Sequence, residues 1–173
     1  MRQRPPQGRL RARAVMTALD SSPARRVAVA GVVGALYVVL SLAVAPFAFG
    51  PLQFRVGEAL KPLVIKYPAT IPAFGVGTVI INLFSPFAGT LELVFMPLVD
   101  VTGGVLCYLV ARRVGGALGT YLGSLLYALY TAAGVGVVLT VVAGLPYLVS
   151  FASVAVSETI LLLAGNALLV RRV

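Results

Sequence analysis

Long apolar segments separated by short turns run through most of the chain. Residues 114–157 form a stretch of 44 residues without a single Asp, Glu, Lys or Arg. A helix that crosses the hydrocarbon core of a bilayer needs about 20 apolar residues, so this stretch alone predicts most of two membrane-spanning helices. Applied to the whole chain, the pattern predicts an all-α integral membrane protein with six transmembrane helices in one bundle.

Pro, Gly and polar residues mark the ends of these helices. The six predicted helices cover residues 27–45, 54–66, 69–83, 92–111, 115–142 and 147–170. The second is short: its 13 residues span only ~20 Å as an α-helix, which is less than the ~30 Å hydrocarbon core. We therefore expect the preceding segment, 46–53, to be a structured loop that dips into the bundle, because non-helical backbone at membrane depth must be surrounded by protein or by a cavity.

The basic residues predict the orientation of the bundle. They stand in four places: Arg25 and Arg26, Lys66, Arg112 and Arg113, and Arg171 and Arg172. Each interval between neighbouring places is long enough for two crossings of the membrane. The turns near positions 50, 86 and 145 carry no Lys or Arg. Under the positive-inside rule both termini are then cytoplasmic, in a multi-pass protein of the plasma membrane.

Residues 1–26 are rich in Arg, Pro and polar residues, and hold seven of the 14 basic residues. This composition predicts a disordered cytoplasmic tail attracted to anionic lipid, with a partner-docking arm as the alternative. The membrane domain covers residues 27–173. The net charge of +9 therefore describes a tail and loop ends rather than a nucleic-acid surface. A signal peptide is a competing interpretation of the first apolar segment, but the segment is too long and Pro46 disfavours cleavage after Ala45.

The absence of some residue types excludes several classes of function. The chain has no His and one cysteine, Cys107, so a disulfide within the chain is excluded and a metal site built from Cys and His is not expected. A catalytic triad that uses His is impossible. No G-x-x-x-x-G-K-[ST] motif is present, so we expect that this chain does not hydrolyse ATP. We expect a protein that is not an enzyme and uses no cofactor or metal.

Polar residues concentrate in the stretch 45–66, which reads APFAFGPLQFRVGEALKPLVIK. Glu58 and Lys61 lie three positions apart and share one face of a helix. Such side chains are costly inside a membrane and usually face a cavity or a partner. Asn82 has an alternative role as a cap of its helix end or of the following turn. Glu92 has an alternative role in an interaction with the helix dipole. On the predicted topology, five polar residues lie toward the outer side of the membrane: Gln53, Arg55, Glu58, Asn82 and Glu92.

Two carboxylates are expected closer to the middle of the membrane. Asp100 lies about two helical turns beyond Glu92 on the same side, and Glu158 lies near the middle of the last helix. The polar layer then holds two cations, Arg55 and Lys61, and four carboxylates. If the cations pair internally, two carboxylates remain for a cationic or hydrogen-bond-donating ligand that enters from outside.

Small residues form a stripe near the start of the first predicted helix. Ala30 and Gly34, like Gly31 and Ala35, are pairs of small residues four positions apart. Such a face allows another helix to approach closely. A separate partner protein and a neighbouring helix of the same bundle both fit it, and the sequence leaves the two open.

Four segments resemble one transporter family. FGPLQFRVGEAL (49–60) is similar to the FGPxQFRxSEAL-type segment of the queuosine-precursor transporter family, QueT. The resemblance continues through IPAFGVGTVIINLFSP (71–86), LELVF (91–95) and VAVSETI (154–160), and covers about residues 27–170. The chain departs from the family pattern in having Gly57 for the usual Ser, Ser157 for the usual Gly, and charged residues at Lys61 and Asp100.

The resemblance implies the substrate-binding S component of an energy-coupling-factor (ECF) transporter. Such a six-helix subunit binds its substrate from outside and associates with a transmembrane T component, through the small residues of its first helix, and with two cytoplasmic ATPases. The implied substrate is a 7-deazaguanine such as preQ1, preQ0 or queuine. Glu58 and Glu158 would be its carboxylate ligands, with Arg55 orienting Glu58. The remaining outer polar residues would contact the edges of the base: Gln53, Asn82 and Glu92.

Two other functions stay open at this point. A secondary carrier driven by protons would use Asp100 or Glu158 as its proton site, and its uptake would not depend on partner ATPases. A structural subunit without a ligand would need a polar layer that is fully self-paired.

Overall fold

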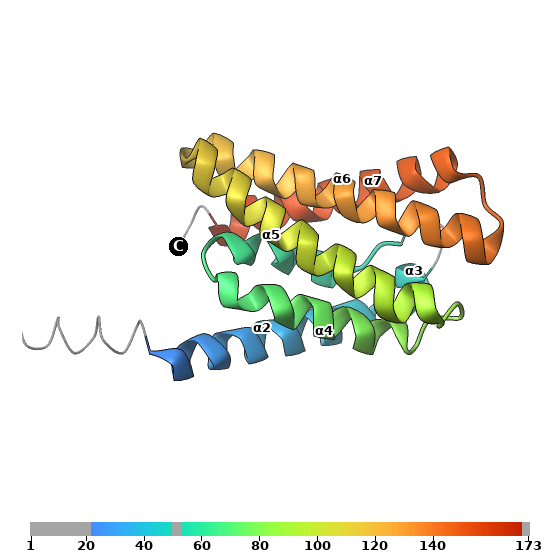
Figure 1. Ribbon diagram of the computed structural model, residues 1–173, viewed down its shortest axis with the longest axis horizontal. Coiled ribbons are helices and arrows are strands. Elements are labelled where there is room, and N and C mark those ends of the chain that lie inside the picture. Colours follow the sequence, from blue (N-terminus) through green and yellow to red (C-terminus); the bar gives the residue numbers. More distant parts are fainter. Residues whose placement is uncertain (1–21, 50–52, 171–173) are drawn as a thin grey trace, which may run out of the picture.

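The computed structural model describes residues 22–49 and 53–170, which contain helices and no strand (Figure 1). Six helical segments run up and down through one bundle. Figure 1 shows α2 and α4 on one side of the bundle, α6 and α7 on the other, and α5 between them. The elements are α2 (Pro23–Ala43), α3 (Ala45–Ala48), η1 (Val56–Ile65), η2 (Pro68–Thr70), α4 (Ile71–Asn82), η3 (Leu91–Phe95), α5 (Met96–Val114), α6 (Gly116–Ala143), α7 (Tyr147–Gly165) and η4 (Asn166–Val170).

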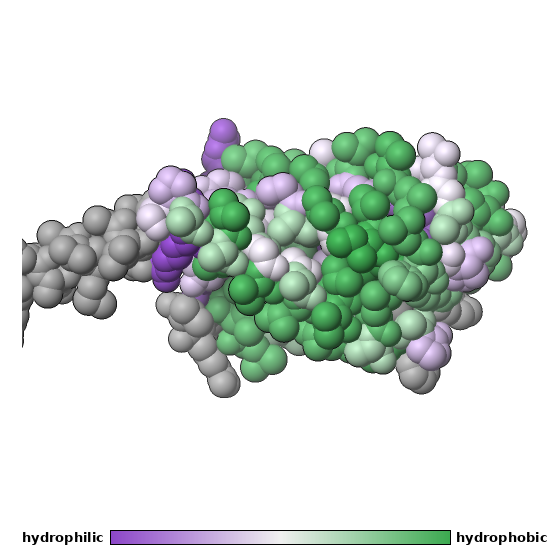
Figure 2. All heavy atoms as spheres, turned by 90° about the horizontal axis from the view of Figure 1, so that it is seen from below, coloured by the Kyte–Doolittle hydropathy of each residue, from purple (hydrophilic) through white to green (hydrophobic). Residues whose placement is uncertain are grey.

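The membrane character that the sequence predicts is confirmed by the lengths and composition of these helices. Among the described residues, four helices are long and apolar enough to cross a bilayer: Pro23–Ala43, Leu91–Val114, Gly116–Ala143 and Tyr147–Val170. The apolar helix Pro68–Asn82 is shorter. Hydrophobic residues cover most of the face in Figure 2, and hydrophilic ones gather toward the end at which α2 begins. Figure 1 places the start of α2 and the end of η4 at the same end of the bundle, while the sidedness of that end stays a prediction.

The first helix begins earlier than the prediction. α2 starts at Pro23 instead of residue 27, because Ser22 caps it by accepting a hydrogen bond from the Arg25 backbone N–H at 3.2 Å. Ser followed by Pro is a strong start signal for a helix. Residues 23–26, assigned above to the tail, therefore belong to the helix. The rest of the predicted tail (residues 1–21), part of the loop (50–52), and Arg171 and Arg172 lie outside the described residues.

The second predicted helix is a 3₁₀ helix, so the prediction of an α-helix over 54–66 was wrong in type. η1 has ten residues and contains Pro62. At ~2.0 Å per residue it is ~20 Å long, so this helix is as short as predicted. η1 passes through the bundle against α2, α5 and α7. A Cβ atom at Gly57 would lie 2.5 Å from the carbonyl oxygen of Tyr37, and one at Gly165 would overlap the carbonyl of Ala59, so glycine allows close backbone packing on both sides of η1.

The fourth predicted helix starts with a π-helical turn, η3, instead of a regular α-helix. Pro97 has no backbone N–H to continue the α-helical pattern, and the N–H of Met96 bonds the carbonyl of Leu91, five residues back. This turn interrupts the regular register that related Glu92 to Asp100 in the sequence analysis. α5 then continues to Val114, three residues beyond the predicted end, because Gly115 takes a positive φ of 72°.

The remaining boundaries agree with the turn residues. The predicted third helix, 69–83, corresponds to η2 and α4, and the predicted fifth, 115–142, corresponds to α6. α6 ends at Gly144, whose left-handed φ of 66° suits glycine. α7 and η4 together cover residues 147–170 as predicted.

Candidate functional site

Three charged side chains meet inside the bundle where η1 passes α5. Lys61 Nζ donates to Asp100 Oδ1 at 2.5 Å and forms a salt bridge with Glu58. Each of the three residues is only 1% exposed. Residues three apart eclipse each other on a 3₁₀ helix, so Glu58 and Lys61 share a face as predicted. The site thus begins with an internal ion-pair network that joins η1 to α5.

Hydroxyl groups complete this network. Tyr37 Oη donates to Glu58 Oε1 at 2.9 Å and lies 3.1 Å from Thr78 Oγ1, and Thr78 donates to Asp100 Oδ2. Tyr127 Oη donates to the backbone carbonyl of Asp100 at 2.8 Å. Both carboxylates therefore have a partner on each oxygen.

The hydroxyl partners of this network were not predicted from the sequence, although their residue types offered a signal. Tyr37 and Tyr127 are completely buried and Thr78 is 1% exposed. A buried Tyr usually finds a hydrogen-bond partner, so a tyrosine in the middle of an apolar helix points to a polar neighbour. Which neighbour it finds depends on how the helices pack, and the sequence does not give that.

Two of the departures from the QueT pattern contact each other. Lys61 and Asp100 are 39 positions apart and are joined by the 2.5 Å ion pair. A single buried charge without a partner costs several kcal/mol, whereas a paired one is tolerated. The two charges therefore belong together as one paired feature of this chain.

Glu158 brings a third carboxylate to the network from α7. The side chain is 3% exposed and lies within electrostatic range of Glu58, Lys61, Asp100 and Arg55. Its Oε2 atom has no hydrogen-bond partner among the described residues. The neighbouring Ser157 hydroxyl donates to the Val154 carbonyl at 3.0 Å. Glu158 is thus a buried carboxylate that retains capacity for a hydrogen-bond donor.

Asn82 and Glu92 lie together at the junction of α4 and η3. Asn82 Nδ2 donates to the backbone carbonyl of Glu92 at 2.8 Å. Within the described part of the chain, Asn82 Oδ1 and Glu92 Oε2 are buried without a hydrogen-bond partner. The Asn82 amide donor thus connects α4 to η3 instead of capping its own helix, and a ligand contact of either residue stays a prediction.

Arg55 and Gln53 lie at the start of η1. Arg55 Nη2 donates to Gln53 Oε1 at 3.2 Å, and the guanidinium carbon lies 5.3 Å from the ring centroid of Phe49. Among residues 22–49 and 53–170, Gln53 is the one non-glycine residue with a positive φ (48°). Strain of this kind gathers at ligand sites and switch regions. The oxygens of Glu58, which Arg55 was expected to orient, accept from Tyr37 and Lys61.

With this geometry in place, the chain can be compared with known proteins. A family model described as QueT transporter matches residues 27–171. The chain belongs to the QueT transporter family. No curated protein and no solved structure matches it. The resemblance inferred from the motifs is confirmed, and the match covers the described helices except the first four residues of α2.

The QueT motif segments supply most of the buried polar residues. The segment 49–60 provides Gln53, Arg55 and Glu58, and the segment 91–95 coincides with the π turn η3 that carries Glu92. Asn82 comes from 71–86 and Glu158 from 154–160. Of these residues, Glu58 and Arg55 lie within electrostatic range of Glu158, as does Asp100 of α5, while Asn82 bonds to the backbone of Glu92.

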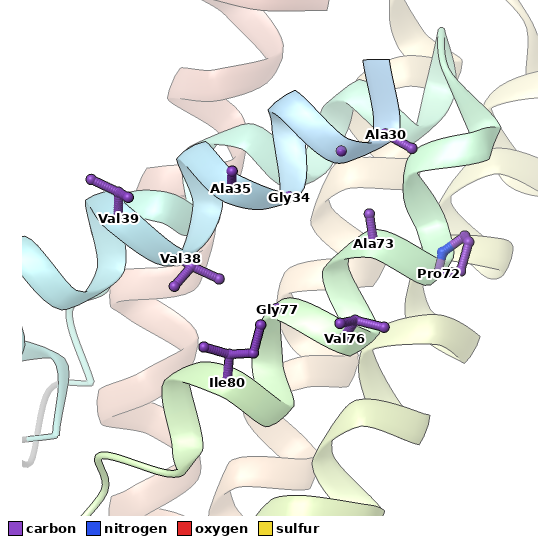
Figure 3. A pocket seen from close by; sticks show the side chains of 11 residues that line it. Ala30, Gly34, Ala35, Val38, Val39, Pro72, Ala73, Val76, Gly77 and Ile80 are labelled. Atoms are coloured by element: carbon purple, nitrogen blue, oxygen red, sulfur yellow. The ribbon is translucent and has the colours of Figure 1, made fainter. Parts of the chain in front are cut away.

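A groove of about 540 Å³ opens between α2 and α4, and no charged residue lines it (Figure 3). A Cβ atom at Gly31 would meet nothing within 4 Å, while one at Gly34 would lie 3.1 Å from Ala73 Cβ of α4. Gly34 therefore packs within the bundle, and Gly31 faces open space. The lining is apolar and comes from both helices: Ala30, Gly31, Gly34, Ala35, Val38, Val39, Pro72, Ala73, Val76, Gly77 and Ile80.

Proposed function

We propose that this QueT protein is the S component of an ECF transporter and imports a queuosine precursor or a related 7-deazaguanine. The observation that carries the proposal is a set of buried polar atoms without hydrogen-bond partners in the described residues. Three of these atoms are acceptors on predicted site residues outside the ion-pair network: Asn82 Oδ1, Glu92 Oε2 and Glu158 Oε2. Because a buried acceptor without a partner costs free energy, they favour a ligand rich in N–H donors.

A 7-deazaguanine offers such donors. Its guanidine-like N–H edge suits a carboxylate, and we assign that contact to Glu158. PreQ1 adds an ammonium group that suits a second carboxylate, for which Glu92 has an open oxygen. The base also carries a carbonyl, which Arg55 suits because a guanidinium has five N–H donors.

Glu58 and Asp100 have a different place in this scheme. Their oxygens already accept hydrogen bonds or ion pairs from Tyr37, Lys61 and Thr78. A carboxylate oxygen can accept a second hydrogen bond, so Glu58 remains a candidate contact to the base, while Asp100 forms part of the wall behind it. Gln53 fixes Arg55 through its side-chain oxygen.

The proposed partners are a transmembrane T component and two cytoplasmic ATPases. The groove between α2 and α4 supports a helical partner, because small residues allow close helix approach inside a membrane. Gly31 and Ala35 line this groove and are exposed. The proposed location is the plasma membrane with both termini cytoplasmic. Fusing a reporter that works only outside the cytoplasm to the C-terminus tests this orientation. Activity of that reporter would contradict it.

Thermal stabilisation of the detergent-purified protein tests the substrate. A ligand that binds only the folded state stabilises it by an amount set by its concentration relative to its Kd. PreQ1, preQ0, queuine and guanine are compared with thiamine and riboflavin as controls. We expect a selective rise in melting temperature with a deazaguanine. If no deazaguanine shifts the melting temperature of folded protein, the assigned substrate is wrong.

Reconstitution separates the proposal from a proton-driven carrier. One of the two proton sites considered for a carrier, Asp100, is bonded to Lys61 and Thr78. Uptake into vesicles by an S component requires the T component and ATP hydrolysis. Uptake by this chain alone, driven by a proton gradient, would replace the ECF proposal with the carrier.

A further inference from the structure

Lys61 is surrounded by groups that attract a cation. Its Nζ contacts the carboxylates of Glu58 and Asp100. The same atom lies 5.1 Å from the ring centroid of Tyr127 and 5.7 Å from that of Tyr37. Carboxylates and aromatic rings together are typical components of a site for an ammonium ion. The protein therefore fills such a site with its own lysine.

This lysine changes the charge that a ligand meets. Around Glu158, within electrostatic range, lie two further carboxylates, Glu58 and Asp100, and two cations, Lys61 and Arg55. With every one of these five residues counted as ionised, the three carboxylates and two cations carry a net formal charge of −1. Removal of Lys61 would leave −2. A difference of one charge acts strongly on a charged ligand in a low-dielectric interior.

We propose that Lys61 determines the charge specificity of the substrate site. Its ammonium occupies the cation position between Glu58 and Asp100, so a ligand cannot use that position for a second positive charge. The site therefore favours a cationic ligand over a neutral one of the same shape less strongly than it would without Lys61. Lys61 acts through the two carboxylates, while the open oxygen of Glu158 receives a donor of the ligand. This inference rests on the proposed function, since it assigns the ligand to the same region.

Four proteins test the inference through their formal charge: wild type (−1), Lys61→Met (−2), Asp100→Asn (0) and the double variant Lys61→Met/Asp100→Asn (−1), counted over the same five residues. Two probes share one ring system: preQ1, with an aminomethyl cation, and preQ0, with a neutral nitrile. Isothermal titration gives the ratio of the preQ0 Kd to the preQ1 Kd. Because this ratio compares two ligands on one protein, a partial loss of folded protein cancels.

We expect the ratio to be highest for Lys61→Met, equal for wild type and the double variant, and lowest for Asp100→Asn. A unit charge about 10 Å from the ligand, at an effective dielectric constant of about 20, should change this ratio of Kd values roughly tenfold for each unit of formal charge. The same ratio in all four proteins would overturn the inference. So would a double variant that follows Lys61→Met instead of wild type, because the effect would then come from the lost side chain and not from charge.

A second experiment needs no deazaguanine. Lys61→Ala vacates the ammonium position, so propylammonium chloride should raise the melting temperature of this variant, whereas 1-propanol and sodium chloride should not. Lys66→Ala is the matched control, because Lys66 directly follows η1 and its Nζ has no hydrogen-bond partner within the described residues. Neither this control nor wild type should respond. An unresponsive Lys61→Ala protein, or an equal response of the control, would overturn the ammonium site.

The two experiments keep the possible failures apart. If wild type binds neither deazaguanine, the proposed function fails, and the propylammonium result still decides whether Lys61 fills a cation site. If Lys61→Ala does not yield folded protein, the titration series decides the inference, because Met retains most of the volume of the lysine side chain.

Discussion

Glu158→Gln should weaken ligand binding without weakening the fold. Gln keeps the shape of the side chain and removes its charge. Because Glu158 Oε2 has no hydrogen-bond partner in the described residues, the substitution removes no internal hydrogen bond at that atom. It also reduces repulsion from Glu58 and Asp100, which lie within electrostatic range. We therefore expect the melting temperature without ligand to be unchanged or higher.

The expected loss of affinity follows from the kind of bond that is lost. A hydrogen bond to a charged group contributes about 1.5–3 kcal/mol, and each 1.4 kcal/mol corresponds to tenfold in Kd. Glu158→Gln should therefore raise the Kd for the best deazaguanine roughly 10- to 100-fold. Isothermal titration in detergent measures the Kd, and a thermal melt on the same sample measures stability.

Glu58→Gln is the matched comparison, because Glu58 accepts from Tyr37 at 2.9 Å and pairs with Lys61. Breaking a buried ion pair costs up to about 3–5 kcal/mol, so this variant should melt at a lower temperature without ligand. Affinity that stays at the wild-type value in folded Glu158→Gln would refute the assignment of Glu158 to the ligand. A fall in ligand-free stability of Glu158→Gln would show that this carboxylate has a structural partner.

Four further substitutions test the packing and the groove. Gly57→Ala places a methyl group 2.5 Å from the carbonyl oxygen of Tyr37, so it should lower the free energy of unfolding by about 1–3 kcal/mol in chemical denaturation; unchanged stability would contradict the close packing. Tyr37→Phe leaves Glu58 Oε1 without its 2.9 Å partner and should cost about 1–3 kcal/mol in the same assay, with wild-type stability as the contrary outcome. Gly31→Leu points into open space and should keep ligand stabilisation but abolish reconstituted uptake, whereas Gly34→Leu should reduce both; equal loss of both activities in Gly31→Leu would place Gly31 in the core.

Local turn chemistry was sufficient to predict where most helices end, but not what kind of helix forms. The last helix follows from Gly144 and Pro146, and its predicted span of roughly 147–170 agrees with α7 and η4 together. The 3₁₀ form of η1 depends on packing against α2 and α7, where Gly57 and Gly165 allow close contact. That information comes from segments far away in the chain. The π turn had a local signal in Pro97, which lacks the N–H that a regular α-helix needs.

The charged residues show a similar division between local and distant information. The shared face of Glu58 and Lys61 was predictable, because residues three apart face the same way in α- and 3₁₀ helices alike. The pairing of Lys61 with Asp100 crosses 39 positions and joins two elements. Counting charges predicted that two carboxylates would remain after internal pairing. It did not show that one lysine pairs with two of them, which leaves Glu92 and Glu158 with open oxygens.

The small residues of α2 show why a stripe in the sequence does not identify its own partner. Gly31 and Gly34 are three positions apart and both belong to small-residue pairs. The sequence therefore does not distinguish which of them contacts another protein. In the structure Gly34 is buried against Ala73, and Gly31 is exposed in the groove. α4 therefore covers one edge of the stripe and, together with α2, forms the walls of the groove. A partner helix that docks there must contact both elements, and α4 also carries Thr78 and Asn82 of the buried polar site.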